Sequence, residues 1–290
     1  MDWLERVTEL RQWTRQGVRA PHKPLLLLYA LGRYQRDAGE GLKYTAVEGD
    51  LKNLLAEYGP ARATSPSYPF HHLTSDGVWE VSTDLGDGSP GSGVGKLKES
   101  GATGRLALEL RSDLRRRPEL LWQLTRLILE RHFPPSLHAE LCEAVGLDLD
   151  PLAAYALTKR RQRDPRIRES VLAAYDHQCA FCGYDGALGS RPVGLEAAHV
   201  RWWAFAGPDT IDNALCLCAL HHKLFDKGVL GISPTHRILV SPLYTGTTPA
   251  SHTHVTSLSD HPIRTPRPDA PHISTPHREW HMTQVFRTAA

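Results

Sequence analysis

Residues 179–226, CAFCGYDGALGSRPVGLEAAHVRWWAFAGPDTIDNALCLCALHHKLFD, decide the fold of the C-terminal part of the chain. They contain two pairs of metal-binding residues, Cys179 with Cys182 and Cys218 with His221, and two residues separate the members of each pair. Two such pairs can close a tetrahedral zinc site around a short fold. For one pair alone, two buried small side chains are the simpler interpretation, but both pairs at this spacing favour zinc. We therefore predict a structural zinc bound by these four side chains.

The remaining cysteines leave one alternative for this site. Cys142 lies in a helical pattern and is predicted to be a core residue. Cys216 is two residues from Cys218 and is therefore the alternative zinc ligand. Because four of the five cysteines cluster in this stretch, they indicate metal binding in a reducing, cytoplasmic compartment rather than disulfides.

The same stretch carries the pattern of two strands followed by a helix. Val193–Val200 predicts a short strand whose end presents His199. Leu215–Leu217 predicts the returning strand, and Ala219–Lys227 predicts a helix that stops at Gly228.

The order of His199, Asn213 and His222 between and beside the two cysteine and histidine pairs resembles the HNH nucleases, the ββα-metal family. The matching segments are Ala197-Ala198-His199, Asp212-Asn213-Ala214, and Cys218-Ala219-Leu220-His221-His222 followed by Leu224-Phe225-Asp226. The resemblance covers about residues 165–245. It implies a DNA endonuclease that hydrolyses phosphodiester bonds with a divalent metal, Mg²⁺ or Mn²⁺, at the scissile phosphate.

The resemblance also implies a role for each matching residue. His199 would be the general base that takes a proton from water, because imidazole titrates near neutral pH. Asn213 would orient His199 and hold the loop between the strands, and His222 would bind the catalytic metal. Many members carry a second metal ligand directly before the first histidine, where this chain has Ala198. Glu196 is the nearest carboxylate and a candidate for that ligand, although a solvated strand residue is an equal interpretation.

The N-terminal part is predicted to be mostly helical with a small sheet. Apolar residues at three- and four-residue spacing predict helices over residues 2–16, 25–34, 47–58, 118–132 and 137–145. Between the third and fourth of these, residues 78–81 alternate like a strand. The glycine loop ending at Lys96 is one residue too short for a P-loop and lacks a following Ser or Thr, which excludes nucleotide hydrolysis by such a loop.

These patterns predict an α+β protein with two domains, 1–150 and 166–290, joined by a basic linker at 151–165. The net charge of +2 does not by itself indicate a nucleic-acid-binding protein. Two basic runs, Lys159–Arg168 and Arg111–Arg117, can contact a phosphate backbone, although each alone is also typical of a solvated surface.

The remaining segments carry simpler predictions. No apolar run is long enough to span a membrane, and the charged N-terminus is not a signal peptide. Ser251–Pro276 is rich in Pro, Thr and His and is predicted to be poorly ordered or loosely packed. The apolar face of residues 279–286 is predicted to dock on the nuclease domain.

A second resemblance lies in the N-terminal part. Arg19–Leu26, RAPHKPLL, and Tyr68–Leu73, YPFHHL, resemble the sulfur-binding domain of McrA-type restriction endonucleases. Those enzymes join that domain to an HNH domain and cut DNA whose backbone carries a phosphorothioate. The resemblance implies a type IV-like restriction enzyme whose partner is phosphorothioate-modified double-stranded DNA.

Sulfur in place of a phosphate oxygen is larger, softer and poorly hydrated, so an apolar cup can accept it. On the resemblance, Tyr68, Pro69 and His72 would form that cup. Four further residues would contact the remaining oxygens and the DNA backbone: His22, Lys23, Arg19 and Lys96. A packed turn at residues 68–70 and a helix start at residues 21–24 are the alternative interpretations.

Two other functions remain open from the sequence. One is an HNH nuclease specific for another modification, such as a methylated base. The other is a zinc-containing DNA-binding module without catalysis. The presence of all three matching residues, His199, Asn213 and His222, argues against this second alternative. A homodimer is expected on DNA, because one HNH site cuts one strand and a duplex needs two cuts.

Overall fold

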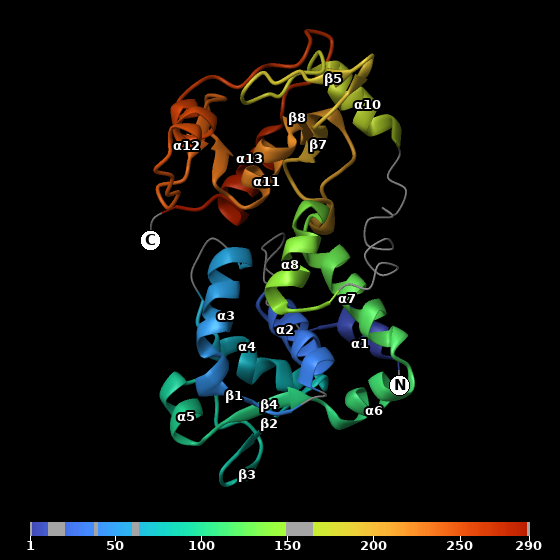
Figure 1. Ribbon diagram of the computed structural model, residues 1–290, viewed down its shortest axis with the longest axis vertical. Helices are drawn as coiled ribbons and strands as arrows, with labels where there is room; N and C mark the ends of the chain where they lie inside the picture. The colour runs from blue at the N-terminus through green and yellow to red at the C-terminus, as the bar shows by residue number, and fades with distance from the viewer. Residues whose placement is uncertain (1, 11–20, 38–39, 60–63, 149–164, 289–290) are drawn as a thin grey trace. The chain divides into compact units, whose positions relative to one another are not determined.

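The computed structural model describes residues 2–10, 21–37, 40–59, 64–148 and 165–288. The chain divides into two compact units, Met1–Lys159 and Arg160–Ala290 (Figure 1). Each unit has its own buried hydrophobic core. Helices and small antiparallel sheets make up both units, which confirms the predicted α+β class. No helix in the described ranges is long and apolar enough to cross a bilayer.

Helices dominate the N-terminal unit. They are α1 (Trp3–Thr8), α2 (His22–Asp37), α3 (Tyr44–Tyr58), α4 (Ser67–His72), α5 (Val94–Glu99), α6 (Leu108–Arg116), α7 (Glu119–His132) and α8 (His138–Val145), with 3₁₀ turns η1 (Leu73–Asp76) and η2 (Pro135–Leu137). The strands are β1 (Leu42–Lys43), β2 (Trp79–Thr83), β3 (Gly86–Asp87) and β4 (Thr103–Leu106). They pair antiparallel in the order β1-β4-β2-β3.

Helix α2 forms the centre of this unit. Its residues from Leu25 to Leu31 are all buried, and it packs against α3, α4, α7 and α8. It begins at His22, earlier than the predicted residue 25, because Pro24 is tolerated in a first helical turn. Helix α1 ends at Thr8, before the predicted residue 16, and residues 11–16 lie outside the described ranges.

The short helix α4 is held against the sheet by one aromatic residue. The ring of Phe70 meets that of Trp79 edge to face, with centroids 5.4 Å apart. Trp79 Nε1 also donates to the carbonyl oxygen of Phe70 at 3.0 Å. Gly104 makes room for this contact, since a Cβ there would lie 2.0 Å from the Trp79 ring. The segment 68–70 is therefore helical rather than a simple turn, and Phe70 fixes the orientation of its neighbours.

The C-terminal unit is built around a strand pair and the helix that follows it. Its helices are α10 (Pro165–Ala174), α11 (Ala219–Asp226), α12 (Pro249–His254) and α13 (Thr275–Gln284), with 3₁₀ turns η3 (Trp203–Phe205), η4 (Ile211–Asn213) and η5 (Thr256–Leu258). Its strands are β5 (Ala187–Leu188), β6 (Arg191–Pro192), β7 (Leu195–His199), β8 (Ala214–Cys218), β9 (Leu230–Ile232) and β10 (Ile238–Val240). Strands β7 and β8 pair antiparallel with His199 opposite Ala214, and α11 follows directly. This is the predicted ββα arrangement.

The segment 251–276 contradicts the prediction of poor order. It contains α12 and η5, and four of its apolar side chains join the core of the C-terminal unit: Val255, Leu258, Ile263 and Ile273. These apolar residues are irregularly spaced among Pro, Thr and His, so the composition of the segment did not identify them as core residues. Helix α13 packs in the same unit and buries Trp280 and His281.

Candidate functional site

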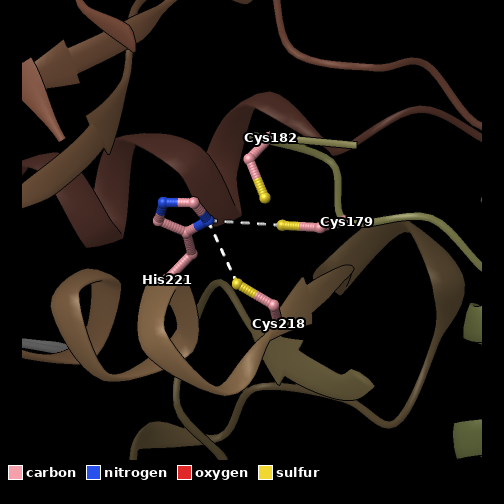
Figure 2. A group of neighbouring side chains, drawn as sticks. All are labelled: Cys179, Cys182, Cys218 and His221. Carbon is pink, nitrogen blue, oxygen red and sulfur yellow. Dashed lines mark hydrogen bonds between the residues drawn. The ribbon is translucent and has the colours of Figure 1, made fainter. Parts of the chain in front are cut away.

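Four side chains converge in the C-terminal unit: Cys179, Cys182, Cys218 and His221. Figure 2 shows the three sulfur atoms on one side of the imidazole, facing one ring nitrogen. Their ligand atoms all lie within 4.8 Å of one another. His221 Nδ1 is 3.5 Å from Cys179 Sγ and 3.2 Å from Cys218 Sγ. Bonded to one tetrahedral zinc at the usual lengths, a sulfur and a nitrogen would lie roughly 3.5 Å apart. The cluster therefore suits a metal such as zinc.

The surroundings of the cluster prepare its atoms as ligands. His221 Nε2 donates to the carbonyl oxygen of His254 at 2.8 Å, so the proton sits on Nε2 and the lone pair on Nδ1 faces the sulfurs. Hydrogen bonds from Cys182 and Cys218 lower the pKa of Cys179, which favours the thiolate that metals bind.

Cys216, the alternative ligand, is not part of this cluster. It is fully buried in β8, and burial raises its pKa to about 12. A thiol in that state stays protonated and is a core residue, which leaves Cys218 in the group of four.

His199 lies at the end of β7 and is paired with a residue that the sequence did not single out. Its Nε2 is 2.7 Å from Asp209 Oδ1, and the histidine side chain is 8% exposed. A carboxylate only accepts, so Nε2 carries the proton and Nδ1 holds the lone pair of the neutral ring. This is the arrangement of a general base oriented by a carboxylate.

Asn213 is completely buried and closes the loop between β7 and β8. Its Oδ1 accepts from the backbone N–H of Arg201 at 2.8 Å, and its Nδ2 donates to the carbonyl oxygens of Arg201 and Pro208. Gly207 permits this close approach, because a Cβ there would lie 1.8 Å from the carbonyl oxygen of Arg201. These bonds hold the loop that carries Asp209, the partner of His199.

His222 lies between two carboxylates. Its Nδ1 is 2.5 Å from Glu196 Oε2, and its Nε2 is 3.1 Å from Asp226 Oδ2. Burial lowers the pKa of His222, but Asp226 and Glu196 raise it more strongly, to about 9. Glu196 also shares a face of β7 with residue 198, since side chains alternate along a strand.

Asp226 and Trp202 complete this part of the site. The carboxylate of Asp226 is 1% exposed, and its Oδ1 accepts from Trp202 Nε1 at 2.9 Å. Asp226 follows His222 by four residues on α11, so the helical spacing could have suggested the pair. The contacts of Asp209 and Trp202 depend on the folded loop.

In the N-terminal unit, three predicted residues form a group of rings. Tyr68 and His72, four residues apart on α4, have ring centroids 4.2 Å apart, and His22 at the start of α2 lies 6.2 Å from Tyr68. Tyr68 is 39% exposed, whereas Pro69 is buried. His22 Nε2 is within 2.9 Å of Thr64 Oγ1. We call Tyr68, His72 and His22 the ring cluster.

The charge beside the ring cluster is neutralised. Lys23 Nζ lies 2.5 Å from Asp76 Oδ2, and both side chains are buried. Burial lowers the pKa of His72, and His71 and Lys23 lower it further, so this ring is neutral near pH 7. The charge of Lys23, which the resemblance implies contacts DNA, lies in a buried ion pair with Asp76.

The other basic residues are placed as follows. Lys96 is exposed on α5. Arg116 and Arg117 each lie within 4 Å of Asp113 on α6, which offsets part of that basic run. Arg19 and the linker residues 151–164 lie outside the described ranges.

Comparison with known proteins decides the family. Residues 1–150 match the family of ScoMcrA-like DNA sulfur-binding domains. The chain belongs to this family. Residues 179–233 match the HNH endonuclease family, and with the ββα geometry they make the chain an HNH-family DNA endonuclease. No curated protein matches the chain.

Three solved structures are each similar to about half of the chain. The sulfur-binding domain of ScoMcrA complexed with phosphorothioated DNA is 24% identical over 51% of this chain and 96% of its own, with a TM-score of 0.43. That of SprMcrA, also with phosphorothioated DNA, is 26% identical over 50% and 93%, with a TM-score of 0.42. The type IV phosphorothioation-dependent restriction endonuclease ScoMcrA is 22% identical over 51% of this chain and 32% of its own, with a TM-score of 0.43.

Proposed function

We propose that this chain is a type IV-like restriction endonuclease that binds phosphorothioate-modified double-stranded DNA and hydrolyses phosphodiester bonds near the modification. The observation that carries the proposal is the presence, in one chain, of a sulfur-binding domain family at residues 1–150 and an HNH endonuclease family at residues 179–233. The first would supply the specificity and the second the chemistry.

In the proposed reaction, Nδ1 of His199 takes a proton from the attacking water while Nε2 stays bonded to Asp209. The negative charge of Asp209 stabilises the imidazolium that forms, and Asn213 keeps the loop between them closed. His199 would then be the base, with Asp209 and Asn213 as residues that position it.

Glu196 and His222 would hold the catalytic divalent cation. The protein would supply only two ligands, a carboxylate and an imidazole. This suits Mg²⁺ or Mn²⁺, because these ions keep several bound waters and also bind phosphate oxygens of the substrate. The donor set fits, since a cation can replace the proton that Nδ1 of His222 shares with Glu196, while Nε2 remains bonded to Asp226. When bound, the cation neutralises the charge that develops on the scissile phosphate.

The ring cluster supports a preference for sulfur over oxygen. Tyr68 and His72 offer exposed and partly exposed ring surface, His72 is neutral, and Asp76 neutralises the charge of Lys23. A neutral, weakly polar surface can replace the poor hydration shell of sulfur, but it cannot replace the hydrogen bonds that an ordinary phosphate oxygen makes with water. The same surface would therefore discriminate against unmodified DNA.

Replacing Tyr68 with alanine is expected to reduce the preference for thioated over plain duplex by about tenfold to a hundredfold, because a small apolar contact is lost. This factor should be similar at every salt concentration, since no counterion is released, whereas the residual binding should fall steeply with salt. The measurement is a salt titration of both duplexes with wild type, Tyr68→Ala and the control Leu85→Ala, whose side chain is 96% exposed.

Each result of this titration has a definite meaning. Equal binding of both duplexes by wild type would reject the sulfur specificity, and tight binding of a methylated duplex would then favour the methylated-base alternative. An undiminished preference in Tyr68→Ala would place the sulfur contact outside the ring cluster.

The overall proposal is tested by cleavage of a plasmid thioated in both strands, compared with the same plasmid unmodified, in the presence of Mn²⁺. Cleavage restricted to the thioated plasmid supports the proposal. Absence of cleavage in both, with intact zinc content, would favour the non-catalytic DNA-binding module.

The products of the same assay report on assembly. We propose that two copies act on one duplex, because one HNH site cuts one strand. Linear plasmid without accumulated nicked circles, together with a dimer on DNA in sedimentation, supports this. Nicked circles that precede the linear form, with a monomer on DNA, would indicate sequential cuts by single copies.

A further inference from the structure

Helix α13 lies well beyond residue 233, where the match to the HNH endonuclease family ends, yet it packs on the catalytic loop. The ring of Trp280 meets that of Trp202 with centroids 5.7 Å apart, and that of Phe205 at 5.5 Å. With Val285 these residues form a small hydrophobic cluster distinct from the main core of the unit. Trp202 and Phe205 belong to the loop between β7 and β8, so α13 supports that loop directly.

A line of contacts leads from Trp280 to the candidate cation ligand. Trp202, which packs against Trp280, donates its indole N–H to Asp226 at 2.9 Å. Asp226 in turn bonds His222, whose other nitrogen faces Glu196. The indole and the carboxylate are both buried, so neither finds water if the other moves away. Trp202 therefore contributes to holding Asp226 in place for His222.

A second contact fixes α11, the helix that carries His222 and Asp226. The ring of His281 stacks on that of Phe225, with centroids 3.7 Å apart and planes within 4°. Its Nε2 donates to the carbonyl oxygen of Phe225 at 3.0 Å, at the residue directly before Asp226. The end of α11 is thus held through its backbone as well as through the Asp226 side chain.

Backbone hydrogen bonds before and after α13 fix the position of this helix along its neighbours. Ser274, just before the helix, donates to the carbonyl oxygen of Asp212 at 2.9 Å, next to Asn213. Arg287, after the helix, donates to the carbonyl oxygen of Gly228 at 2.9 Å, next to the end of α11. The helix therefore connects the end of the catalytic loop to the end of α11.

We propose that α13 sets the geometry of the catalytic cation site, with Trp280 and His281 as positioning residues that act on His222 through Trp202 and Asp226. The inference rests on the proposed role of His222 as a ligand of the divalent cation. It assigns to a segment outside the matched HNH region a direct part in the affinity of the enzyme for that cation. A helix that only stabilised the fold would leave this affinity unchanged in every molecule that remains folded.

The test uses the zinc-loaded full chain and three variants, Trp280→Ala, Trp280→Phe and the control Thr283→Ala, whose side chain on α13 is exposed. Mn²⁺ binding is measured by calorimetry without DNA, and zinc content and thermal unfolding are measured on the same samples. We expect Trp280→Ala to weaken Mn²⁺ binding about tenfold to a hundredfold, as loss of a supporting residue around a metal does. Trp280→Phe should recover most of the loss, and Thr283→Ala should match wild type.

Trp202→Phe provides a second route if Trp280→Ala does not fold. This change keeps a ring against Trp280 but removes the N–H that holds Asp226, so it should weaken Mn²⁺ binding by a similar factor. Folded, zinc-loaded Trp280→Ala or Trp202→Phe with wild-type Mn²⁺ affinity would overturn the inference.

His222→Ala separates this inference from the proposed function. If His222→Ala binds Mn²⁺ as tightly as wild type, the proposed role of His222 is wrong and the inference fails with it. If His222→Ala loses binding while folded Trp280 and Trp202 variants keep it, the ligand assignment stands and only the role of α13 fails.

Discussion

Replacing His199 with alanine is expected to slow cleavage of thioated DNA by roughly a hundredfold to ten-thousandfold, which is the contribution of a well-placed general base. The residue lies at the end of β7 with its Nε2 held by Asp209, so its imidazole is oriented before substrate arrives. The alanine substitution removes the base. It leaves unchanged the four residues of the candidate zinc site and the residues of the ring cluster. Binding of the thioated duplex, zinc content and thermal unfolding should therefore stay close to wild type.

Single-turnover cleavage and duplex binding measured on the same preparation check this result. His252→Ala is the matched control, because this exposed histidine lies in the same unit but in α12. Asp209→Asn should give a smaller loss than His199→Ala, since the hydrogen bond to His199 can survive while the stabilising charge is removed. Near wild-type cleavage by purified His199→Ala would reject its role as the base.

The local parts of the nuclease site could be predicted because their spacing is local. Cys218 and His221 belong to one strand end and one helical turn, and the strand, loop and helix order follows from short patterns in residues 193–228. The side chain that holds His199 could not be identified in this way. Asp209 reaches His199 only because Asn213 and Gly207 fold the loop back on itself.

Charge pairing in the N-terminal unit shows the same limit. Lys23 lies 53 residues from Asp76, and nothing in the sequence near either residue indicates that they meet. The expectation that Lys23 contacts DNA came from the resemblance of residues 19–26 to the sulfur-binding domain, and the buried pair adds a structural effect to its removal. Lys23→Ala would leave the buried carboxylate of Asp76 without this ion pair, so it should destabilise the unit in addition to weakening contacts to phosphate in both duplexes.

Removal of the metal predicted at the four-residue cluster is expected to unfold the C-terminal unit while the N-terminal unit stays folded. Structural zinc contributes about 10–16 kcal/mol of apparent binding free energy in small zinc domains, and this equals or exceeds the usual 5–15 kcal/mol of domain stability. In this chain the cluster joins the turn at Cys179 and Cys182 to the end of β8 and the first turn of α11, where Cys218 and His221 lie. Without the metal, only weak hydrogen bonds between the sulfur atoms and His221 would join these elements.

Metal analysis and thermal unfolding of wild type, Cys179→Ser, Cys218→Ser and Cys216→Ala test this expectation. The two serine variants should lose zinc and the unfolding transition of the C-terminal unit, yet they should still bind thioated duplex, because the ring cluster lies in the other unit. Cys216→Ala should keep its zinc, since that thiol is buried in β8 outside the cluster. Loss of zinc from Cys216→Ala together with its retention in Cys218→Ser would show that Cys216 is the ligand. Purified wild type without zinc would reject the predicted zinc site. The three cysteines and the histidine would then be held close together by packing alone.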